Sequence, residues 1–172
     1  MATANTLVQI GSTVTVGGGG AATIDFTSIP ATYTDLVVKM SARSNDSGTN
    51  WNNIKVTFNT SSANASWKAI RGYNGSIVNS SASSQIEVWI DFNASTANVF
   101  GNLEIYIPNY TSSNYKSISA DMVTEGTSSD EHAAILTGLW SDTAAINALG
   151  FTPSSGSFLQ YTTASLYGIL KY

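Results

Sequence analysis

The chain has no cysteine and only one histidine, and these shortages exclude several kinds of site at once. Without cysteine it can form no disulfide, no thiolate metal centre and no cysteine nucleophile. A small secreted eukaryotic domain usually carries disulfides, so that class of protein is disfavoured.

Charge is also scarce, since 10% of residues are charged against a typical share of about 25%. The net charge of −4 provides no basic footprint, so we expect no nucleic-acid partner. No apolar run is long enough to span a membrane, so we expect no membrane partner. The first five residues are neither basic nor apolar, so we expect no signal peptide.

Ser, Thr, Asn and Gly take the place of the missing charges. These residues favour turns, and Ser and Asn compete with the backbone hydrogen bonds of a helix. A length of 172 residues suffices for one domain with a real core.

The clearest strand signal runs from Tyr33 to Arg43. Its side chains alternate between an apolar series containing Leu36 and Val38 and a wetter series containing Lys39. Successive strand residues face opposite sides of a sheet, so this segment predicts one buried and one solvated face. Similar patterns predict strands at 7–10, 13–16, 22–26, 51–59, 67–73, 85–92, 99–107, 114–123, 132–140 and 158–172.

Roughly nine or ten short strands with one polar face each are typical of antiparallel sheets. We therefore predict an all-β fold, an antiparallel β-sandwich with little or no helix. Asn74-Gly75 is a hairpin signal, and Ser80 to Ser84 is expected to be a polar loop. Asp142 to Gly150 is the only plausible helical turn, although Ile146 and Leu149 could instead lie in a strand followed by a turn.

The tetraglycine Gly17–Gly20 divides the chain into two unequal parts. We expect an N-terminal arm with a glycine-rich tether over residues 1–20 and a β-sandwich domain over residues 21–172. No Gly-Lys-Ser/Thr follows the glycines, so we reject a phosphate-binding loop.

The sequence offers little for catalysis, and we expect no enzyme, no metal and no cofactor. His132 follows Asp130 and Glu131, but no nucleophile motif accompanies it, so a loop or interface histidine is the favoured interpretation. Glu87 and Glu104 could align if their strands paired, as glycosidase chemistry requires, but solvated surface carboxylates explain them better.

Calcium binding through Asn45 and Asp46 is a further alternative. Their loop lacks the ordered acidic ladder of an EF-hand, so we do not favour a calcium site.

Trp89 and Tyr106 are the candidate interface residues. Both fall among charged residues on strand faces that should be wet, where large rings mark an interface or a ligand platform. Our preferred hypothesis is a contact between copies of the chain, and stacking against sugar rings is the alternative.

Several short segments resemble small β-sandwich structural proteins of tailed bacteriophages. The opening pattern runs from Ile24 through Ile29-Pro30 to Leu36, followed by Ser41-Ala42-Arg43-Ser44. The ending contains Gly156-Ser157-Phe158 and Ala164 to Ile169. Phe58-Asn59 and Ile107-Pro108-Asn109-Tyr110 fall between them in the same order.

The resemblance implies a jelly-roll-like module, usually a homotrimer, displayed on the virion after assembly in the bacterial host cytoplasm. Members are capsid decoration or cement proteins, head fibres, or receptor-binding tips of tail fibres that recognise host surface glycan. No shaft or coiled coil precedes this sandwich, so the resemblance favours binding to the outside of the shell, with the major capsid protein or other virion proteins as partners. On that view the arm is an anchor that adds to a neighbour's sheet edge, through Leu7, Val8, Ile10, Val14 and Val16.

Overall fold

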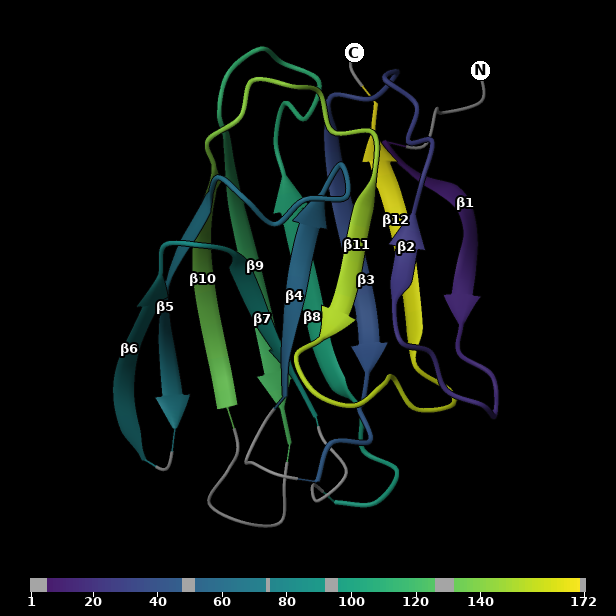
Figure 1. Ribbon diagram of the computed structural model, residues 1–172, viewed down its shortest axis with the longest axis vertical. Coiled ribbons are helices and arrows are strands. Elements are labelled where there is room, and N and C mark those ends of the chain that lie inside the picture. Colours follow the sequence, from purple (N-terminus) through teal and green to yellow (C-terminus); the bar gives the residue numbers. More distant parts are fainter. Residues whose placement is uncertain (1–5, 48–51, 74, 92–95, 126–131, 171–172) are drawn as a thin grey trace.

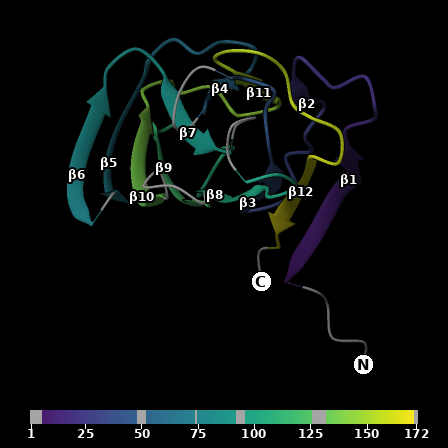
Figure 2. The same cartoon turned by 90° about the horizontal axis from the view of Figure 1, so that it is seen from below.

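The computed structural model describes residues 6–47, 52–73, 75–91, 96–125 and 132–170. These residues form twelve strands and no helix, so none of them forms a membrane-spanning helix. The predicted all-β sandwich is confirmed, because the strands make two antiparallel sheets that face each other (Figures 1 and 2).

The wider sheet has eight strands, in the order β1 (Leu7–Thr15), β12 (Thr163–Ile169), β3 (Asp35–Ala42), β8 (Gly101–Ile107), β9 (Lys116–Thr124), β10 (His132–Trp140), β5 (Ala65–Tyr73) and β6 (Ser76–Ala82). The narrower sheet has four, in the order β2 (Ile24–Phe26), β11 (Leu149–Pro153), β4 (Asn52–Phe58) and β7 (Ile86–Ile90). Most connections cross from one sheet to the other, as in a jelly roll.

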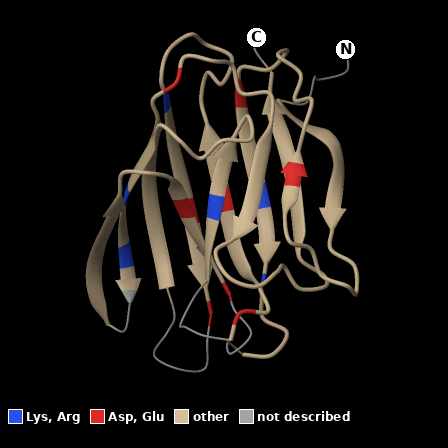
Figure 3. Ribbon diagram, in the orientation of Figure 1, with Lys and Arg blue, Asp and Glu red and all other residues tan. Residues whose placement is uncertain are grey.

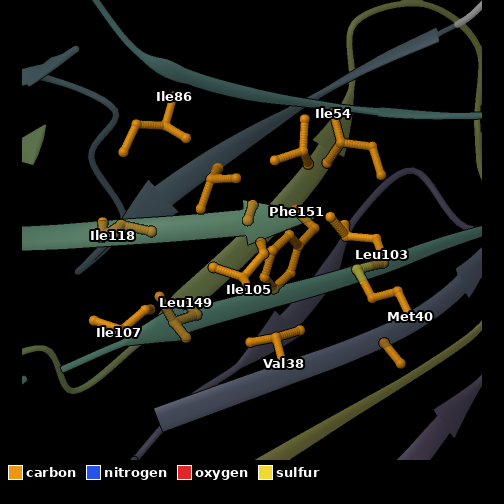
Figure 4. Close-up of a cluster of buried hydrophobic side chains, with 14 of the residues drawn as sticks. Val38, Met40, Ile54, Ile86, Leu103, Ile105, Ile107, Ile118, Leu149 and Phe151 are labelled. Atoms are coloured by element: carbon orange, nitrogen blue, oxygen red, sulfur yellow. The ribbon is translucent and has the colours of Figure 1, made fainter. Parts of the chain in front are cut away.

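The core lies between the sheets and follows from the alternation in each strand. Val38 and Met40 of β3 meet Ile54 of β4 and Phe151 of β11 in one buried cluster (Figure 4). Each strand contributes alternate residues, because its side chains point to opposite faces. Charged residues are scattered singly over the strands instead of gathering in a block (Figure 3).

Two local expectations are wrong. Ser80 to Ser84 was expected to be a loop, but β6 continues through Ala82, because an edge strand of this sheet needs no apolar alternation to pair with β5. The helical turn expected at Asp142 to Gly150 is absent: the Asp142 carboxylate accepts a hydrogen bond from the Ala144 N–H at 2.8 Å, and Leu149 begins β11, which pairs with β2 and β4. The strand alternative is therefore confirmed for Leu149 and wrong for Ile146, which precedes β11 and lies in no strand.

The N-terminal segment forms one strand instead of two short pieces. β1 pairs with β12 of its own chain, and the register shifts between Ile10 and Val14, where Gly11 has a φ of 71°. A left-handed residue in such a bulge explains why the strand signal breaks at Gly11. The division of the chain at residue 20 stays a prediction.

Candidate interaction surface

The outer face of the eight-stranded sheet carries rows of side chains that the register places side by side. One row runs from Ile70 of β5 to Ile135 of β10, Asp121 of β9, Glu104 of β8 and Lys39 of β3. These residues face away from the narrow sheet, so nothing in the sandwich core covers them.

An apolar patch occupies the end of this face formed by β5, β6, β9 and β10. We define it by five exposed side chains: Ile70, Ile77, Val123, Ile135 and Leu139. Ile77 is 81% exposed, Ile135 72% and Ile70 61%. A groove of about 1150 Å³ lies over the same four strands, with Lys68 and Asp121 among its lining residues. Clustered exposed aliphatic groups of this kind mark a surface that gains free energy when covered.

The sequence of β10 explains why the patch exists. Its inward residues Ala134, Leu136 and Trp140 are buried, yet Ile135 and Leu139 on the outward face are also apolar. A strand that is apolar on both faces is typical of a strand covered on both sides. The sequence-based prediction missed Ile135 and Leu139, although the apolar character of both faces of β10 indicates them.

The other half of the face contains β3 and β8, and polar contacts link these two strands. The Tyr106 hydroxyl donates to the Asp35 carboxylate at 2.8 Å, and Lys39 Nζ lies 2.8 Å from Glu104 Oε2. The hydrogen bond to Asp35, with burial and the negative charge of that carboxylate, raises the pKa of Tyr106. The hydrogen bond and charge of Glu104 raise the pKa of Lys39. The outward position expected for Tyr106 is confirmed, at 36% exposure.

The exposure expected for Trp89 is wrong, because this residue is 4% exposed. It lies on β7, the edge strand of the narrow sheet, and β5 of the wider sheet contacts that strand. The Trp67 ring packs edge-on against the Trp89 ring with centroids 5.5 Å apart, and the Arg71 guanidinium lies 5.4 Å from its centroid. Alternation within β7 could not reveal this cover, since it comes from a different sheet. Trp89 therefore offers no surface to another copy.

The two carboxylates considered for glycoside hydrolysis do not face each other. Glu87 lies on the narrow sheet opposite Lys55 and accepts a hydrogen bond from Asn53 Nδ2 at 3.3 Å. Glu104 lies on the outer face of the wider sheet, beside Lys39. Their strands belong to different sheets and do not pair, so the alignment considered as the alternative does not occur.

His132 begins β10, as the strand predicted over 132–140 requires, and it is buried, so the loop position favoured for it is wrong. Asp130 and Glu131 lie outside the described residues. Asn45 Oδ1 accepts a hydrogen bond from the Ser157 N–H at 2.7 Å, and Asp46 Oδ1 accepts one from the Ser155 hydroxyl at 3.3 Å, so both tie this loop to the β11–β12 connection. Across the described ranges, no three His, Asp or Glu residues gather as metal ligands would.

Lys116 is a buried cation that the sequence reasoning missed. Its Nζ donates to the carbonyl oxygens of Ser112 at 2.8 Å and Ala144 at 2.6 Å, and lies 5.3 Å from the Trp140 ring centroid. Burial lowers the pKa of this ammonium, while Asp142 opposes the shift. Lys116 shares the inward side of β9 with Ile118, so alternation could have found it. It joins two loops and faces no open site.

The residues expected to anchor the chain lie in or beside β1. Leu7 is exposed, Val8, Ile10 and Val14 are half-buried, and Val16 is buried. Because β1 pairs with β12 of the same chain, these residues extend their own sheet in this structure. Their anchoring role stays a prediction.

Comparison with protein-family models and with curated proteins gives no relative to guide the interpretation. No protein-family model matches the chain, and no curated protein matches it. The surface must therefore be interpreted from its own chemistry. It offers aliphatic area for burial, flanked by the Lys68 ammonium and the Asp121 carboxylate.

Proposed function

We propose that this protein is a structural component of a bacteriophage virion, a decoration or cement protein that binds the outside of the capsid shell. The observation that carries the proposal is the apolar patch, which is an exposed, aliphatic surface on one sheet of the β-sandwich. The assignment to a phage particle comes from the sequence resemblance. The expected homotrimer stays a prediction.

The chemistry of the patch favours a protein partner over a glycan. Its five members are aliphatic, whereas sugar rings are held by stacking on aromatic rings and by polar groups. Trp89, on which the sugar-stacking alternative partly depended, is buried. Burying an exposed isoleucine side chain contributes roughly 1.5–3 kcal/mol, so a few such contacts per copy suffice when symmetry repeats them.

Binding to capsids tests the proposal. Capsids of the phage that encodes the chain, prepared without this protein, would be mixed with purified protein and sedimented. The variant Ile70→Ser/Ile135→Ser should bind at least about tenfold more weakly, because it removes two apolar contacts. Tyr115→Ser is the matched control, since it removes an exposed ring outside the patch.

Two results would contradict the proposal. One is capsid binding that the patch variant leaves unchanged. The other is antibody labelling of intact particles on the tail and not on the head, which would favour a receptor-binding tail tip, to be followed by a glycan array.

A further inference from the structure

β6 is the open edge of the eight-stranded sheet. It pairs with β5 on one side, and no described strand pairs with the other (Figure 1). The β5–β6 hairpin closes with Tyr73 opposite Ser76, and the closing pair of a two-residue hairpin exchanges backbone hydrogen bonds. Alternate residues then point away from β5, so Ile77, Asn79 and Ser81 direct their N–H and C=O groups to the open edge.

This edge lacks the usual protection against pairing. Proteins block open strands with charges, proline or bulges. β6 has the sequence SIVNSSA, without charge or proline, and its register with β5 is continuous over seven pairs. β1, at the opposite edge, is interrupted by a bulge between Ile10 and Val14. Only one of the two edges is thus an uninterrupted template for another strand.

The sequence of β6 suits a second copy of itself. Asn79 is the central residue of the strand, so an antiparallel pair related by a two-fold axis places Asn79 beside Asn79 and Ile77 opposite Ser81 of the other copy. The same three residues present the outward backbone groups, which gives about six hydrogen bonds across the pair. The strand carries no charge, so two copies meet without repulsion between like charges.

We propose that β6 pairs with β6 of a second copy, antiparallel and centred on Asn79, to make one sheet that continues across two chains. Directly opposed residues of antiparallel strands point to the same face of a sheet. The two apolar patches therefore join into one surface that spans both copies, and Ile77, the most exposed of the patch residues, comes to lie beside the new strand. This contact does not depend on the phage assignment.

The first experiment measures the mass of the full chain in solution by sedimentation equilibrium over a range of concentrations. We expect an assembly with an even number of copies: two, or six if the homotrimer implied by the resemblance also forms. Asn79→Pro should halve the mass, raising the dissociation constant at least about tenfold, because it removes the central outward N–H from both copies. Proline at this position leaves the hydrogen bonds to β5 intact, and circular dichroism would check the fold.

The second experiment uses charge to test the two-fold geometry. Asn79→Lys and Asn79→Asp each place like charges side by side across the two-fold axis. The dissociation constant of each variant alone should therefore rise about fivefold. Mixing the two variants should restore the assembly, because the charges are then opposite. Ser12→Lys is the matched control: it adds the same charge to the β1 edge and should leave the mass unchanged.

Several results would overturn the proposal. A wild-type chain that stays monomeric or trimeric at all concentrations excludes the pairing, and so does an even-numbered assembly that all three Asn79 variants leave intact. Failure of the mixed variants to reassociate would exclude the two-fold centre at Asn79. If Asn79→Pro does not fold, the Lys and Asp variants decide the question alone.

Discussion

Two aliphatic residues on the outer face of the same sheet have very different surroundings. Val37 of β3 is 6% exposed, whereas Ile135 of β10 is 72% exposed. The register places Tyr106 on one side of Val37 and Tyr167 on the other. Ile135 has Ile70 on one side and Asp121 on the other.

The comparison teaches that cross-strand neighbours decide whether an outward aliphatic residue is covered. A tyrosine ring is broad enough to cover a neighbour on the adjacent strand, whereas isoleucine and aspartate are not, and this accounts for the low exposure of Val37. In the half of the face that contains Val37, the outward aliphatic side chain is therefore covered within one chain. In the half that contains Ile135, the outward aliphatic side chains stay exposed, and a partner can bury them. Four predictions test this difference, from the largest expected effect to the smallest.

Trp89→Ala should have the largest effect, although it lies beneath the patch and not on it. Removing a buried ring that packs on Trp67 and Arg71 leaves a cavity, so the free energy of unfolding should fall by about 3–5 kcal/mol. Chemical denaturation measures the change. Ile135→Ala, on the exposed side of the same region, is the control and should cost less than about 1 kcal/mol.

A small loss for Trp89→Ala, or a change in assembly mass without a change in stability, would restore the interpretation of Trp89 as an interface residue. It would also mean that the patch does not rest on a packed layer.

The sequence predicted the strands better than it predicted their partners. Both ends of β10, His132 and Trp140, were predicted correctly, because the alternation of side chains within a strand marks where the strand begins and ends. β6 was missed, since Ser76 to Ala82 is an edge strand without apolar periodicity. The burial of Trp89 depends on β5, which alternation within β7 cannot reveal.

The candidate surface was only partly predictable. The outward position of Tyr106 followed from alternation in β8, but the location of the apolar patch depends on the order β9-β10-β5-β6. That order joins residues far apart in the chain, such as Ile70 and Ile135, and no local pattern encodes it. The apolar character of both faces of β10 was the one local sign.

The second prediction concerns the cover over Val37. Tyr106→Phe keeps the ring but loses the hydrogen bond to Asp35, which should cost about 1 kcal/mol or less at this exposed position. The folded pKa of Tyr106 is raised, so its contribution is fully present below the ordinary tyrosine pKa of about 10 and is lost as pH rises through the folded value.

Unfolding measured from pH 8 to pH 11 should therefore show the wild type losing its advantage over Tyr106→Phe at the alkaline end. Lys39 titrates in both proteins, so the difference between them isolates the tyrosine. An advantage that grows above pH 10 would contradict the assigned hydrogen bond.

The third prediction reverses the character of the exposed half. Asp121→Tyr places a ring beside Ile135 and removes a carboxylate that lies opposite Glu104. Both changes should stabilise the fold, together by about 0.5–1 kcal/mol. Binding of a hydrophobic dye should also decrease, because Ile135 gains a cover like that of Val37. Ser119→Tyr, which adds a ring to the same strand opposite Thr137, is the control and should leave dye binding at Ile135 less affected.

The smallest effect is expected for the ion pair between Lys39 and Glu104. Both side chains are about half exposed, and water and salt screen their attraction, so the pair should contribute less than about 0.5 kcal/mol. A double-mutant cycle with Lys39→Met and Glu104→Gln, measured at low and at high salt, gives the coupling. A coupling well above that limit would mean that polar contacts, as much as the tyrosines, hold this half of the face together. A coupling near zero would leave the two tyrosines beside Val37 as the feature that explains why the two halves of the face differ in exposure.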